Sequence, residues 1–223
     1  MASFKLLVKS SVGRKFLVGA TGLALSDFVL THMSGNTLLW LGPEAYNTYA
    51  HKLISNPFIV VAEVILVSLF LTHVVLALLL ARENKVARSL APSQLASNCE
   101  KNARFGSRYM VLTGLLVLVF SVLHLITFKY GTVYTTTYNG VEMRDLHRLV
   151  VETFKLPLYT GWYLISMVVL FVHLAHGFTA TFQSLGLFSV KHPCLKKLGW
   201  FFAFIVAGGF FSQPIYGYFF GGN

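Results

Sequence analysis

Long apolar stretches alternate with short basic stretches along the whole chain. Five apolar stretches have the roughly 20 residues that a helix needs to cross the hydrocarbon core of a bilayer. They span residues 16–40, 58–81, 109–128, 158–182 and 198–220. Pro57 and Pro157 directly precede two of them, where proline suits the start of a helix. The pattern therefore predicts an all-α fold, a single domain over residues 1–223 that forms a polytopic bundle of five transmembrane helices.

The first apolar stretch follows a basic N-terminus, so a cleaved signal peptide is the alternative to a retained helix. The tripeptide ALS at residues 24–26 would suit cleavage, but the apolar run resumes at Phe28 and continues to Trp40. We therefore expect the first helix to be retained.

Basic residues lie between the apolar stretches, and this spacing explains the net charge of +10 by topology rather than by nucleic-acid binding. Most lysines and arginines fall in the N-terminus and in loops 82–108 and 183–197. The positive-inside rule then places the N-terminus in the cytoplasm and the C-terminus outside. In the outer loop 129–157, helical spacing of apolar residues predicts a short interfacial helix. These residues are Leu146, Leu149, Val150 and Phe154.

The cysteine and glycine patterns argue against several kinds of metal, haem and phosphate site. Cys99 and Cys194 form neither a CxxC nor a CxxCH motif, so a thiol-ligated cluster, a zinc ribbon and a c-type haem are not predicted. The glycine-rich phosphate-binding motifs are also missing from the sequence.

Histidines are the most informative polar residues within the spans. Each alone is explained equally well by helix packing and by function, but their depths agree. His32 and His124 lie sixteen and fifteen residues into helices that run outward, and His73 and His173 lie sixteen and fifteen residues into helices that run inward. At about 1.5 Å per residue, the two levels differ by roughly 12 Å along the membrane normal. We call His32 and His124 the outer pair, and His73 and His173 the inner pair.

Two histidine pairs at two depths favour two stacked haems. Neutral imidazole is a good axial ligand of haem iron, and helix bundles are a common frame for it. Zinc is the weaker alternative because it needs three or four ligands at one point. The pairs thus predict a path for electrons across the membrane.

Four segments in order carry a resemblance to a known family. They are SSVGRKFLVGATGL with LTHMSGN, AEVILVSLFLTHVVLALLLARENKVAR, YMVLTGLLVLVFSVLHLITFKYG and VHLAHGFTATFQSLGL. In these segments the chain resembles the di-haem cytochrome b membrane anchor of succinate dehydrogenases and fumarate reductases, the type with five helices in a single anchor polypeptide. EAYNTYAHKL is similar to the family's loop after the first helix. The resemblance covers nearly the whole chain.

The resemblance implies two haem b groups and a quinone, usually menaquinone, in the cytoplasmic membrane of a bacterium. It implies axial ligation of the outer haem by His32 and His124, and of the inner haem by His73 and His173. His176 would be a neighbour of the inner haem, near a propionate, or the alternative ligand to His173. The implied partners are an iron–sulfur subunit and a flavoprotein subunit, and association into a higher-order oligomer stays open.

Charged residues near the spans supply further candidates. Glu63 and Glu44 are candidates for proton exchange with the quinone, and Asp27 is a weaker one, while hydrogen bonding within the bundle is the competing explanation. Inner-side cations could meet haem propionates or form a basic face for a partner or anionic lipid. They are Arg14, Lys15, Arg82, Arg104 and Arg108.

The sequence therefore predicts the anchor of a succinate:quinone oxidoreductase, an enzyme subunit that passes electrons rather than transforming succinate itself. The reverse direction, as a quinol:fumarate reductase anchor, is equally compatible with this type. Two competing functions are a non-redox transporter with a histidine proton relay and the cytochrome b of a hydrogenase or formate dehydrogenase. No strong internal repeat and no pair of short, broken helices indicates a transporter.

Overall fold

Five long helices make up most of the structure. The computed structural model describes residue 8 and residues 10–89, 98–187 and 193–221, with the side chains of all these except residues 88–89, 98–108 and 193. The long helices are α2 (Ser11–Asn36), α4 (Ile59–Ser89), α5 (Asn98–His124), α7 (Pro157–Ser184) and α8 (Pro193–Phe219). Each contains a segment long and apolar enough to cross a membrane. The prediction of an all-α polytopic fold is confirmed.

Helix ends differ from the predicted boundaries where polar residues continue a helix beyond the apolar run. α2 begins at Ser11 rather than at residue 16, because the Ser10 side chain accepts a hydrogen bond from the Gly13 amide at 3.0 Å and caps the helix. α4 continues past residue 81 to Ser89 through polar residues. Hydropathy marks only the part of a helix that suits hydrocarbon, so these extensions were not predicted.

The segment after α2 is helical, although the family resemblance implied a loop. α2 passes into a 3-10 turn, η1 (Thr37–Leu41), and Gly42 then turns the chain with a φ of 97°. Pro43 begins α3 (Pro43–Ile54), whose first turn also contains Glu44. Proline at the first helical position and an acid near the N-terminus both favour this helix.

A β-hairpin occupies the first part of the loop between the third and fourth spans, which is a small exception to the all-α fold. Its antiparallel strands are β1 (Thr135–Tyr138) and β2 (Val141–Arg144). The two residues between them, Asn139 and Gly140, have φ values of 52° and 78°. Asn-Gly is the favoured pair for a tight hairpin turn with positive φ at both positions.

The short helix predicted in the same loop is confirmed as α6 (Leu146–Phe154). The Asp145 side chain caps it by accepting a hydrogen bond from the Arg148 amide at 3.0 Å. Val150 and Phe154 are buried in a cluster with residues of η1, α3 and α7. The apolar side of α6 therefore packs on the bundle itself.

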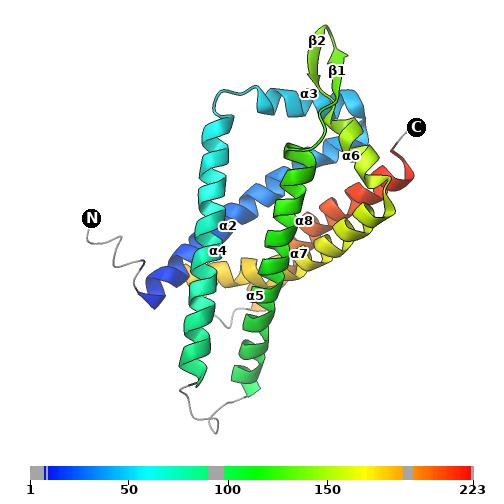
Figure 1. Ribbon diagram of the computed structural model, residues 1–223. Helices are drawn as coiled ribbons and strands as arrows, with labels where there is room; N and C mark the ends of the chain where they lie inside the picture. The colour runs from blue at the N-terminus through cyan, green and yellow to red at the C-terminus, as the bar shows by residue number, and fades with distance from the viewer. Residues whose placement is uncertain (1–7, 9, 90–97, 188–192, 222–223) are drawn as a thin grey trace.

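The helices pack against one another to different extents (Figure 1). α7 packs most extensively against α8, α2 packs against α4 and α7, and α5 packs against α7, whereas α4 and α5 touch only sparingly. α3, the hairpin and α6 lie together at one end of the bundle. We call this the capped end; it corresponds to the predicted outer side.

Asn47 fastens two elements of the capped end to each other. Its side chain, on α3, has no exposed surface. Nδ2 donates to Asp145 Oδ1 at 2.8 Å, and Oδ1 accepts from the His147 amide at 2.8 Å. One amide thus satisfies two groups at the start of α6.

Replacement of Asn47 by alanine should destabilise the protein by about 1–3 kcal/mol, because it leaves the His147 backbone amide without its partner and removes one of the two hydrogen bonds to Asp145 Oδ1. Thermal unfolding of the purified protein in detergent would measure the loss. The control is Asn139→Gly, which changes an asparagine of positive φ to a residue that adopts that conformation freely. Equal melting temperatures for the two variants would contradict the assignment.

Candidate functional site

The outer pair of histidines meets in the structure. His32 on α2 and His124 at the end of α5 have ring centroids 5.9 Å apart and planes inclined at 87°. Two imidazoles that bind one iron from opposite sides, with metal–nitrogen bonds of about 2.0 Å, have ring centres roughly 6 Å apart. The separation of the outer pair therefore fits a shared metal ion.

Aromatic rings enclose the outer pair. Phe28 stacks on the His32 ring at 5.4 Å, and Phe210 of α8 lies 5.6 Å from the same ring. Phe120 and Phe128 lie 5.7 and 5.3 Å from the His124 ring. These walls give the two imidazoles the apolar, water-poor surroundings that suit a haem.

The inner pair lies on helices that do not themselves pair extensively. His73 is on α4 and His173 is on α7, and the two rings are close enough to interact electrostatically. Each is held by a threonine of a different helix. Thr21 Oγ1 lies 3.1 Å from His73 Nδ1, and Thr113 Oγ1 lies 3.1 Å from His173 Nδ1.

The threonine hydrogen bonds determine where the protons of the inner pair lie. Thr21 Oγ1 donates its only hydrogen to backbone carbonyls, with the shorter bond, 2.8 Å, to Leu17, and Thr113 Oγ1 donates likewise to Tyr109 at 2.7 Å. A hydroxyl that donates to a carbonyl can accept from the imidazole, which favours the tautomer with the proton on Nδ1. In that tautomer the lone pair of Nε2 is free, as metal-binding histidines require.

A polar group also lies near Nδ1 of each outer histidine. His124 Nδ1 lies 3.3 Å from the hydroxyl of Tyr163. The Asn36 amide nitrogen donates to the His32 carbonyl at 2.8 Å and lies 3.4 Å from His32 Nδ1, while Asn36 Oδ1 accepts from the Tyr46 hydroxyl at 2.8 Å. The His73 ring also interacts with the backbone of Val18 on α2.

Two glycines leave room for the inner pair. A Cβ added at Gly22 would lie 3.2 Å from His73 Cε1, and one added at Gly114 would lie 3.2 Å from His173 Cε1. Each glycine follows the threonine that holds the same ring, and a histidine of the outer pair comes eleven residues after that threonine. The motif TG-x9-H thus occurs in both α2 and α5. The sequence analysis recognised no strong internal repeat and missed this signal.

His176 differs from the four paired histidines. It is exposed on α7, and its charged neighbour is Lys196 of α8. No hydrogen bond to His173 is found among the described residues. A role for His176 beside the inner haem remains a prediction.

The three predicted acidic residues lie in different surroundings and do not share a site. Glu63 of α4 forms an ion pair with Lys129, five residues beyond His124. Glu44 of α3 is exposed and accepts a hydrogen bond from Asn139 at 3.3 Å. Asp27 is exposed midway along α2. Only Glu63 is thus linked directly to the segment that follows an outer histidine.

That segment is a π-helix, η3 (Leu125–Lys129), which begins directly after His124. Short π-helical turns are rare and are frequent at functional sites. The Arg144 guanidinium donates to the carbonyls of Lys129 and Thr132 at 3.4 and 3.3 Å. The hairpin is thereby fastened to the segment that follows His124.

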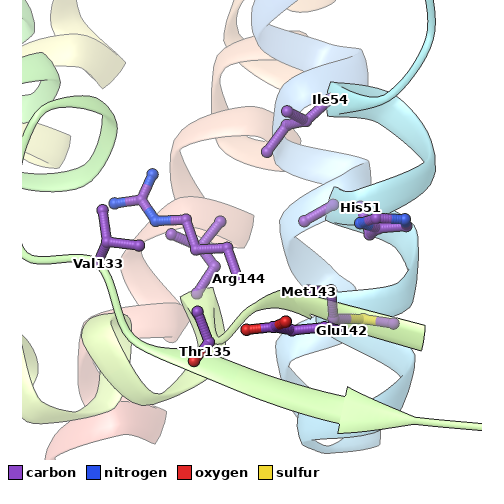
Figure 2. Close-up of a pocket in the computed structure, with 9 residues that line it drawn as sticks. His51, Ile54, Val133, Thr135, Glu142, Met143 and Arg144 are labelled. Atoms are coloured by element: carbon purple, nitrogen blue, oxygen red, sulfur yellow. The ribbon is translucent and has the colours of Figure 1, made fainter. Parts of the chain in front are cut away.

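A hollow of about 360 Å³ lies between α3 and the hairpin. Figure 2 shows Arg144 reaching toward Val133, with His51 on the other side of the hollow. Glu142 and Thr135 also line it. The hollow combines apolar walls with charged groups at the capped end, and the sequence analysis singled out none of these five residues as site candidates.

The predicted inner-side cations are distributed differently. Arg14 forms an ion pair with Glu83 at 2.7 Å, and Lys15 and Arg82 are exposed. The side chains of Arg104 and Arg108 lie outside the described residues. Propionate contacts from these cations remain predictions.

The four paired histidines are arranged as sites with two ligands each. Among residues 10–89, 98–187 and 193–221, no group of three or more His, Cys, Asp or Glu side chains is arranged to hold a metal ion, as a zinc site would require. Paired imidazoles, with aromatic walls around the outer pair and glycine gaps beside the inner pair, fit two-ligand haem sites better than a zinc site. Comparison with protein-family models, with curated proteins and with solved structures found no match to this chain.

Proposed function

We propose that this chain is the di-haem cytochrome b anchor of a succinate:quinone oxidoreductase. The observation that carries the proposal is the arrangement of the four histidines in two pairs. The outer rings lie 5.9 Å apart, and each inner ring has a threonine hydroxyl 3.1 Å from Nδ1, which would leave Nε2 to bind a metal. An iron held by two neutral imidazoles would supply one-electron transfer at each level.

Each residue of the site has a task in this proposal. His32 and His124 hold the outer haem, and His73 and His173 hold the inner one. Thr21 and Thr113 orient the inner imidazoles and increase their basicity through the hydrogen bond to Nδ1. Phe28, Phe120, Phe128 and Phe210 exclude water from the outer pair.

Electrons would pass between an iron–sulfur subunit, itself bound to a flavoprotein, and a membrane quinone such as menaquinone. In the predicted orientation the partners dock on the basic cytoplasmic face, and the quinone reacts near the capped end. The ion pair of Glu63 with Lys129, next to the segment after His124, supports Glu63 over Glu44 as the proton-exchanging acid. The same anchor would serve quinol:fumarate reduction in the reverse direction.

Purification of the chain with its partners from native membranes tests the proposal. We expect a red complex with two haem b groups per anchor chain, and reduction of both on addition of succinate or of a menaquinol analogue. A folded, partner-bound complex without haem would overturn the proposal. Solute flux through haem-free protein in liposomes would instead support a transporter.

A further inference from the structure

Four buried side-chain nitrogens at the capped end have no hydrogen-bond partner within the described part of the chain: Arg144 Nε, His147 Nε2, Trp162 Nε1 and Gln213 Nε2. Two of them, Trp162 Nε1 on α7 and Gln213 Nε2 on α8, are on helices that contact the outer histidine pair. The Gln213 side chain is 7% exposed. Buried donors are nearly always satisfied, because leaving one unpaired incurs the full desolvation penalty of the group. Each of these two donors therefore points to an acceptor that the protein itself does not supply.

Both donors are on helices that contact the outer histidine pair. Gln213 is one helical turn beyond Phe210, whose ring is 5.6 Å from that of His32, on the side of the capped end. Trp162 directly precedes Tyr163, whose hydroxyl lies 3.3 Å from His124 Nδ1. Trp162 also packs on the buried cluster that contains Tyr163. Each donor is therefore within one turn, along its own helix, of a residue that contacts the outer pair.

Nearby acidic groups are already engaged. Asp145 Oδ1 accepts hydrogen bonds from the Asn47 amide and the Arg148 backbone amide. Glu152 accepts from the Arg148 guanidinium at 2.8 Å, and this hydrogen bond holds the pKa of Glu152 below its ordinary value. A bound group that carries exposed oxygen atoms would supply the missing acceptor.

We propose that Trp162 and Gln213 bind the carboxylate side chains of the haem held by His32 and His124, an inference that rests on the proposed function. Both donors are neutral, so they stabilise an ionised carboxylate through hydrogen bonds without cancelling its charge. A hydrogen bond withdraws negative charge from the carboxylate. The carboxylate then stabilises ferric iron less, and the donors raise the affinity of the outer haem for an electron.

Redox titration of the intact, partner-bound complex tests this assignment, with the spectrum of each haem followed separately. Trp162→Phe and Gln213→Leu should each lower the electron affinity of the outer haem, by about threefold to tenfold in the equilibrium constant for reduction. The inner haem should be unchanged. Gln213→Glu preserves the size of the side chain. It should lower the electron affinity of the outer haem further and should make the reduction potential of that haem depend more steeply on pH.

Matched controls are available on the same helices. Trp200→Phe changes an exposed tryptophan of α8, and Gln183→Leu changes a glutamine at the far end of α7. Both should leave the outer haem unaltered. If Trp162→Phe, Gln213→Leu and Gln213→Glu all bind two haems with wild-type potentials, the donors are satisfied by water and the inference is wrong, while the proposed function stands. Wild-type complex without haem would overturn the proposed function first.

Discussion

Replacement of a single paired histidine by alanine should halve the haem content rather than abolish it. His32→Ala and His124→Ala should each lose the outer haem, and His73→Ala and His173→Ala should each lose the inner one. In the proposed site the two members of each pair come from different helices and would hold one iron, so the loss of either would remove one of its two protein ligands. Haem content should fall from two to about one per chain, and one component should disappear from a redox titration.

His176→Ala is the control for this series. His176 is exposed and close to Lys196, whereas His173 is held by Thr113 with its Nε2 free. We therefore expect the His176 variant to retain both haems. If His176→Ala loses a haem and His173→Ala does not, the ligand assignment within α7 is wrong. Loss of the same component from His32→Ala and His73→Ala would contradict the pairing.

The five spans could be predicted because bilayer thickness sets the length of an apolar run. The short elements of the capped end depend on weaker local signals. Pro43 and Glu44 indicate the start of a helix at α3. The segment is not a long apolar run, however, and the family resemblance implied a loop here. The hairpin had a readable signal in Asn139 and Gly140, since this pair favours a tight turn, yet the surrounding strands are only four residues each.

The two depths of the histidines followed from constant helical rise, and this argument needed no knowledge of tertiary structure. The identity of neighbouring helices, in contrast, could be learned only from the tertiary structure. Thr21 reaches His73 across α2 and α4, and Thr113 reaches His173 across α5 and α7. The repeated TG-x9-H motif was present in the sequence, but its meaning depends on these contacts. Burial of Trp162 and Gln213 likewise arises only when the helices pack.

Leucine in place of Gly22 or Gly114 should remove the inner haem and leave the outer one. A Cβ alone at either position already lies 3.2 Å from the ring of His73 or His173, which is tighter than ordinary contact. The longer leucine side chain would displace the imidazole from its threonine and turn Nε2 away from the iron. Overpacking of this kind commonly disturbs a site through shifted rotamers and backbone.

Gly161→Leu provides the matched control, since a Cβ added at Gly161 on α7 meets no atom within 4 Å. It should retain both haems, with the potentials of the wild-type protein. Haem content, redox titration and thermal unfolding of the three variants distinguish a local effect from general misfolding. Because glycine lowers helix stability by about 1 kcal/mol relative to better helix formers, the leucine variants gain local helix propensity. An added Cβ at Gly114 meets only the His173 ring, whereas one at Gly22 also lies 3.1 Å from Thr181 Oγ1. Loss of the inner haem from Gly114→Leu despite that gain would therefore identify the contact with the ring as its cause, whereas wild-type haem content in both variants would show that Gly22 and Gly114 do not shape the inner site.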